Sequence, residues 1–138
     1  MKNLAFKITA ALLIGNSVAL AHEGHDHDAP TTLKAPKGGI VKSLDEARVE
    51  VVSKGKTIKV YLYNKEMKPA KSSEFNVVAK AELPRTKKIE DIILVPNEHF
   101  FEGTYDARGL HRYTLKLAVT DSKTSRTDHL TYTIEPRK

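Results

Sequence analysis

Hydrophobic and polar residues alternate along most of the chain beyond residue 39. A period of two is typical of β-strands, because successive side chains of a strand point to opposite faces of its sheet. Runs of turn-forming residues, such as 54–56 and 64–69, separate the alternating segments. We therefore expect strands near residues 40–41, 49–51, 58–62, 75–81, 92–96, 99–105, 113–119 and 130–134.

This arrangement predicts an all-β fold, a small antiparallel immunoglobulin-like β-sandwich of about seven strands over residues 38–136. No helical stripe interrupts the pattern. The chain has no tryptophan and no cysteine, so it lacks the buried Trp and the disulfide typical of antibody domains. A closed barrel of similar length is the alternative.

The last two strands are expected to form a hairpin. With a turn around Lys123 and Thr124, a register that keeps Leu117 and Leu130 on the same face places them opposite each other and places His129 opposite Ala118. We expect His129 to face solvent. In this register His111 lies too far along the strand to share an ion with His129.

The first 21 residues have a different character from the rest of the chain. Two lysines precede a short apolar run over residues 8–21, which ends in the small-x-small pattern Ala-Leu-Ala of a signal-peptidase site. The run is too short to span a bilayer. We therefore expect residues 1–21 to be a cleaved signal peptide and the protein to be periplasmic, without stable membrane insertion. Residues 22–37 are expected to form a His/Asp-rich flexible tail and linker.

The predicted mature chain begins with His-Glu-Gly-His-Asp-His-Asp over residues 22–28, which holds three of the six histidines. Imidazole and carboxylate groups together suit divalent copper, zinc or nickel. Cleavage after Ala21 would also give His22 a free α-amine, and the amine and ring nitrogen together favour copper(II). A polar spacer is the alternative interpretation of this tract. We expect weak binding of a divalent metal ion, with His22, His25, His27, Asp26 and Asp28 as ligands.

The charge is divided unevenly between the tail and the body. The formal net charge of the full chain is +6, and it falls to +4 when residues 1–21, with their two lysines, are removed. Three of the remaining negative charges lie in residues 22–28, so the part from Pro30 onward has a net charge of +7. Such a basic body attracts acidic partners, and an exported protein rarely meets nucleic acid. The alternative function is therefore a metal-independent cell-envelope interaction module. It would use the basic surface or Tyr61 and Tyr63, which we expect to point outward.

No catalytic constellation is present in the sequence. There is no G-x-S-x-G elbow, phosphate-cradling loop or H-E-x-x-H helix, and the lack of cysteine excludes thiolate metal sites and a cysteine nucleophile. Glu98 and His99, with Glu102, form a weaker candidate cluster near a strand end. We do not expect an enzyme.

Several further segments of the sequence can be compared with known proteins: residues 37–41 (Lys-Gly-Gly-Ile-Val), 47–52, 56–63 and 68–70. Together with the His/Asp-rich start, these segments resemble small periplasmic heavy-metal-handling β-sandwich proteins, and the accessory N-terminal domain of the periplasmic adaptor subunits of heavy-metal efflux pumps. The resemblance implies metal buffering, or delivery to an adaptor or another subunit of an efflux system. Related proteins commonly have histidine where this chain has Lys37 and Arg48, which leaves the tail as the main metal-site candidate.

Overall fold

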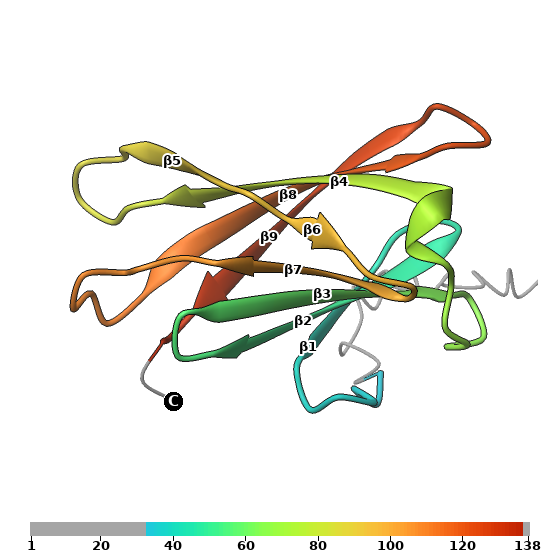
Figure 1. Cartoon of the computed structure of the whole chain (residues 1–138), viewed down its shortest axis with the longest axis horizontal. Coiled ribbons are helices and arrows are strands. Elements are labelled where there is room, and N and C mark those ends of the chain that lie inside the picture. Colours follow the sequence, from blue (N-terminus) through green and yellow to red (C-terminus); the bar gives the residue numbers. More distant parts are fainter. Residues whose placement is uncertain (1–32, 137–138) are drawn as a thin grey trace, which may run out of the picture. The chain divides into compact units, whose positions relative to one another are not determined.

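The computed structural model describes residues 33–136, which form nine β-strands in two antiparallel sheets and one short 3-10 turn, η1 (Ser72–Glu74) (Figure 1). No helix within these residues has the length and apolar character needed to cross a membrane. We call the five-stranded sheet sheet A and the four-stranded sheet sheet B. Sheet A contains β1 (Ile40–Ser43), β2 (Ala47–Lys54), β3 (Thr57–Asn64), β6 (Val95–Pro96) and β7 (Phe100–Thr104). Sheet B contains β4 (Phe75–Glu82), β5 (Ile89–Ile92), β8 (Tyr113–Asp121) and β9 (Thr127–Ile134).

The strand order confirms the predicted immunoglobulin-like β-sandwich. Sheet A runs β1-β2-β3-β7-β6 and sheet B runs β5-β4-β8-β9. Strands β2, β3, β7 and β6 occupy the A, B, E and D positions of an immunoglobulin domain, and β5, β4, β8 and β9 occupy C′, C, F and G. The chain thus forms two separate sheets rather than the closed barrel considered as the alternative.

The core lies between the two sheets and is built from the alternating inward residues. Val49, Val60, Leu62 and Leu115 are fully buried, and each such side chain contributes about 1.5–3 kcal/mol on leaving water. The hydroxyl of Tyr132 on sheet B donates a hydrogen bond of 2.8 Å to the carbonyl oxygen of Val49 on sheet A. Apolar packing and this buried hydrogen bond hold the two layers together without a disulfide.

The predicted register of the C-terminal hairpin is confirmed. Leu117 pairs with Leu130, and His129 pairs with Ala118. His129 is exposed, as expected from its position on the outer face of sheet B. The turn around Lys123 and Thr124, together with apolar side chains kept on one face, predicts this pairing.

The prediction of one strand near residues 92–96 was wrong, because this segment crosses between the sheets. Ile92 ends β5, where it pairs with Ala79 of sheet B, whereas Val95 in β6 pairs with Glu102 of sheet A. Ile93, within the crossover, is 83% exposed. The crossover lies close against Gly103, where an added Cβ would meet the Ile93 carbonyl oxygen at 2.7 Å. The crossover creates two short edge strands in place of one, and the strand count is therefore higher than expected.

Candidate functional site

The predicted metal ligands His22, His25, His27, Asp26 and Asp28 lie outside the described residues. The same holds for the predicted signal peptide and most of the predicted linker. The structure does describe the segment that joins these residues to the sandwich, and the three histidines of the body. We call the joining segment, residues 33–39, the lead-in segment.

The lead-in segment is anchored to sheet A through its backbone. Residues 35–38 form a turn in which the Gly38 N–H donates to the Ala35 carbonyl at 3.1 Å. The N–H groups of Lys37 and Gly39 then donate to one oxygen, Oε1, of the Glu50 side chain, at 3.0 and 2.9 Å. Gly39 lies so close to β2 that an added Cβ would come within 2.3 Å of the Val51 carbonyl oxygen. The end of the predicted linker is thus fixed to the folded body.

Glu50 is a fully buried carboxylate with three hydrogen-bond donors. Its second oxygen, Oε2, accepts a 2.7 Å hydrogen bond from the Tyr63 hydroxyl, and the Glu50 side chain is 0% exposed. A buried charge is stable only when it is paired or hydrogen bonded, and the lead-in backbone supplies two of the donors. Burial, reinforced by the Glu50 carboxylate, raises the pKa of the Tyr63 hydroxyl above its ordinary value. Tyr63 therefore stays a neutral donor at physiological pH.

The expectation that Tyr63 points outward to solvent was wrong. Tyr63 lies on the outer face of β3, as alternation predicts, but it is only 3% exposed. Its hydroxyl is turned to Glu50 instead. Tyr61, on the same face, is half-exposed and stacks at 5.1 Å on Phe100 of β7. Only one of the two tyrosines is therefore available to a partner.

His99 carries one free ring nitrogen but has too few neighbouring ligands for a metal site. Its Nδ1 lies 3.1 Å from the Ala70 carbonyl oxygen, and since a carbonyl only accepts, Nδ1 holds the proton. Its Nε2 lies 3.7 Å from Oε1 of Glu98. Glu102 lies elsewhere, beside Lys59 and Tyr61 on the outer face of sheet A. Within residues 33–136, no group of three or more His, Asp or Glu side chains could hold a metal ion.

His111 and His129 also lie apart. His129 is on the outer face of sheet B, and His111 precedes the first residue of β8. Because each strand residue adds about 3.3 Å, the two imidazole rings are separated along β8 and β9 by too great a distance to coordinate one metal ion. The structure does not bring these two histidines together.

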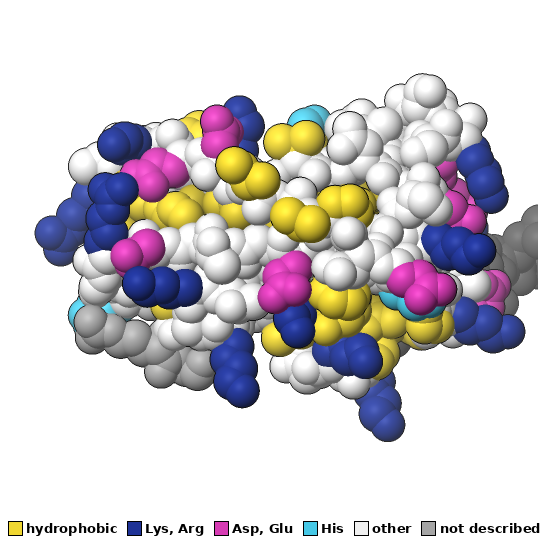
Figure 2. Space-filling view, viewed as in Figure 1, with side chains coloured by type: hydrophobic (Ala, Val, Ile, Leu, Met, Phe, Trp, Pro, Cys, Tyr) yellow, Lys and Arg dark blue, Asp and Glu magenta, His cyan; other side chains and the backbone are white. Residues whose placement is uncertain are grey.

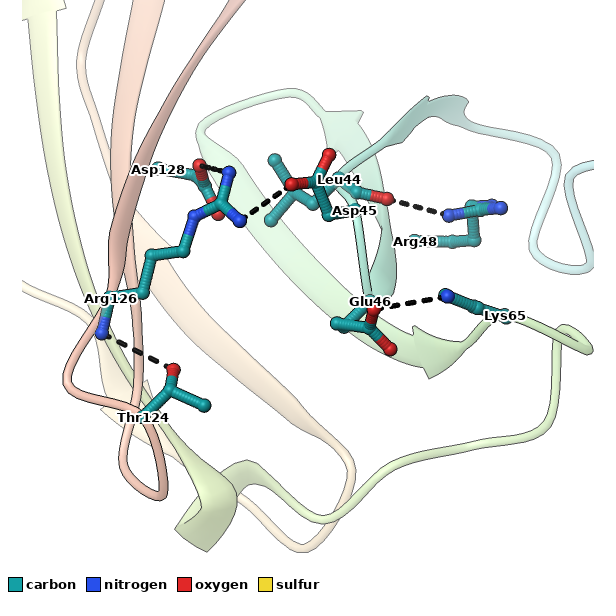
Figure 3. A network of polar contacts seen from close by, with 8 residues as sticks. All are labelled: Leu44, Asp45, Glu46, Arg48, Lys65, Thr124, Arg126 and Asp128. Atoms are coloured by element: carbon teal, nitrogen blue, oxygen red, sulfur yellow. Dashed lines mark hydrogen bonds and ion pairs between the residues drawn. The ribbon is translucent and has the colours of Figure 1, made fainter.

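A cluster of carboxylates between the β1–β2 loop and the β8–β9 turn is neutralised by cations (Figure 3). Arg126 lies 2.5 Å from Asp45 and 3.3 Å from Asp128, and Lys65 lies 3.0 Å from Glu46. The hydrogen bond to Asp45, with the charge of Asp128, raises the pKa of the Arg126 guanidinium. The cluster connects loops of the two sheets and offers no vacant carboxylate set for a metal ion.

The comparisons with known proteins give no further assignment: no protein family, curated protein or solved structure matches the chain. Of the segments that carry the resemblance described above, the His/Asp-rich start lies outside the described residues and residues 68–70 lie in the loop after β3. The others fall in the lead-in segment and in β1, β2 and β3. They contain Glu50, Tyr63 and both backbone donors, and therefore the whole anchor of the lead-in segment.

Proposed function

We propose that the chain is an exported periplasmic protein that binds a divalent transition metal weakly through residues 22–28. The observation that carries the proposal is the density of donors in this tract: three histidines and three carboxylates in seven positions, next to a predicted signal-peptidase site. Its role is to buffer metal or to pass it to a subunit of a heavy-metal efflux system. The protein acts as a carrier and not as an enzyme.

The folded body fixes the residues that follow the proposed metal-binding tract. The Glu50 anchor holds Lys37, which follows His27 by ten residues.

Calorimetric titration of the exported protein with copper(II), nickel and zinc tests the proposal. The N-terminus is first determined by mass spectrometry. Replacement of His22, His25 and His27 by alanine should abolish binding, while the matched variant H99A/H111A/H129A should bind as the wild type does. Binding should also weaken from about pH 7.5 to about pH 5, because protons compete for the imidazoles, whose pKa is about 6.5.

Two results would contradict the proposal. Equal binding by the wild type and the tail variant would place the site elsewhere. No binding by the wild type would favour the metal-independent interaction module, the second candidate function. That second function rests on a separate observation, the lysine-rich face of sheet A.

A further inference from the structure

The outer face of sheet A carries a compact group of cations and aromatic rings. Strand register places Tyr61 of β3 opposite Phe100 of β7, and their ring centroids lie 5.1 Å apart. The Lys37 ammonium lies 5.5 Å from the Tyr61 ring centroid, and the Lys59 ammonium lies 5.5 Å from that of Phe100. We call Lys37, Lys54, Lys59, Tyr61 and Phe100 the cationic-aromatic surface.

This surface borders a hollow, and its lysines form no ion pair with the carboxylates of residues 33–136. The hollow has a volume of about 370 Å³ and is lined by Lys37, Lys54, Lys59, Tyr61 and Glu102, together with Val52 and Thr57. In Figure 2, Lys and Arg side chains project along the lower margin, where Figure 1 places β1 to β3, next to a hydrophobic area. The three lysines face a single carboxylate, and the hollow therefore attracts anions.

Several lysines elsewhere on the body differ in this respect. Lys56, Lys65, Lys80 and Lys116 each form an ion pair with an Asp or Glu side chain. No ion pair joins Lys37, Lys54 or Lys59 to a carboxylate of the described residues. Other lysines, such as Lys68, Lys71 and Lys123, also lack such a pair within residues 33–136, but they do not line the hollow. What distinguishes the cationic-aromatic surface is that three such lysines border one hollow beside two aromatic rings.

The backbone beneath this surface is held by hydrogen bonds. Lys37 places its ammonium over Tyr61 while its N–H is bound to the buried Glu50, and Tyr61 belongs to a central strand of sheet A. A preorganised surface loses little conformational entropy on binding. Lysines stacked on aromatic rings keep both their charge and an apolar contact for a ligand side chain.

We propose that the cationic-aromatic surface binds a carboxylate-rich segment of a partner protein. The carboxylates would pair with Lys37, Lys54 and Lys59, and apolar portions of the segment would lie on Tyr61 and Phe100. Glu102, within the hollow, can accept a hydrogen bond from a backbone N–H, a donor that every non-proline residue of a peptide carries. A peptide therefore fits better than a membrane. The proposal goes beyond metal binding and stands independently of it.

NMR titration of the metal-free exported protein, in the presence of a chelator, tests the proposal. The probe is a short poly-glutamate peptide, and the comparison ligand is a vesicle of equal parts phosphatidylglycerol and phosphatidylcholine. The peptide should shift backbone amides of β2, β3 and β7 and leave those of sheet B unchanged. The variant K37Q/K54Q/K59Q should bind the peptide about tenfold more weakly, since three surface charge pairs are lost.

The matched control removes the same charge from lysines that already have partners. The variant K65Q/K80Q/K116Q should retain the wild-type affinity for the peptide. If both variants lost the same affinity for the peptide, or if amide shifts spread over both sheets, the binding would depend only on net charge. Either result would overturn the proposal. Preference for the vesicles would overturn it in favour of a lipid surface. Because no metal is present, neither outcome depends on the tail site.

Discussion

At the scale of single residues, Glu50 is the most informative side chain of the body. Its carboxylate lies at 0% exposure and accepts hydrogen bonds from two backbone N–H groups and from Tyr63. Hydrogen bonds to a charged group contribute about 1.5–3 kcal/mol each, more than bonds between neutral groups. The lead-in segment is therefore an integral part of the fold.

Replacing Tyr63 by phenylalanine tests this conclusion. The substitution removes one donor from a buried carboxylate and should lower the free energy of unfolding by about 1.5–3 kcal/mol. The matched variant Tyr61→Phe removes the hydroxyl of the half-exposed ring on the same face and should change it by less than about 0.5 kcal/mol. Urea denaturation measures both. Equal losses would show that the Glu50 contact contributes no special stability.

The burial of Glu50 could not be predicted from the sequence. Alternation places Glu50 and Tyr63 on the outer face of sheet A, and an outer face is normally solvated. The residues that cover Glu50 and supply two of its donors belong to the lead-in segment, which reads as a linker because it contains Pro36 and two glycines. Only the three-dimensional path of that segment explains the buried charge.

At the scale of elements, the central strands were predictable and the crossover was not. Strands β2, β3, β4, β8 and β9 are eight or nine residues long, and each contains a run of alternating apolar and polar residues, so their existence follows from local periodicity. The register of the last hairpin follows from its turn together with the face that is buried. In the sequence, residues 92–96 form one apolar run. Its crossover packs against Gly103 of β7, outside the apolar run, and local periodicity contains no sign of this contact.

Gly39 tests the packing of β1 on β2. A Cβ at this position would meet the Val51 carbonyl oxygen at 2.3 Å, and because this neighbour is backbone, the two strands would have to separate. Gly39→Ala should therefore cost about 2–4 kcal/mol of unfolding free energy.

The neighbouring Gly38 provides the control. It has a positive φ of 75° but open space around it, so Gly38→Ala should cost only about 1 kcal/mol of backbone strain. Thermal or urea denaturation separates the two variants. If Gly39→Ala costs no more than Gly38→Ala, the close approach of the two strands is not the constraint proposed here.

At the scale of the whole molecule, stability should fall in alkali because several tyrosines are buried. Burial raises the pKa values of Tyr63, Tyr113 and Tyr132 above their ordinary value. These tyrosines stay protonated in the folded state when the unfolded chain ionises. Their contribution is complete below the unfolded pKa of about 10 and is lost as the pH rises toward the folded value, by about 1.4 kcal/mol per pH unit for each tyrosine.

The variant Tyr113→Phe isolates one of these groups. Its ring packs at 4.8 Å against Tyr105, and phenylalanine preserves that contact. Urea denaturation across about pH 8 to about pH 11 should give a slope above pH 10 that is less steep than the wild-type slope by about 1.4 kcal/mol per unit. An unchanged slope would mean that Tyr113 ionises in the folded protein as it does in the unfolded chain.

Residues 33–136 form a β-sandwich whose lead-in segment is fixed through Glu50 and whose sheet A carries a cationic face. The central proposal is that the histidines of residues 22–28 bind a divalent metal ion, and NMR of the imidazole resonances during titration of the exported protein with zinc tests it most directly. We predict that the resonances of His22, His25 and His27 shift or broaden with added metal while those of His99, His111 and His129 stay in place. Shifts confined to the three body histidines, or no shift of any imidazole, would contradict the claim.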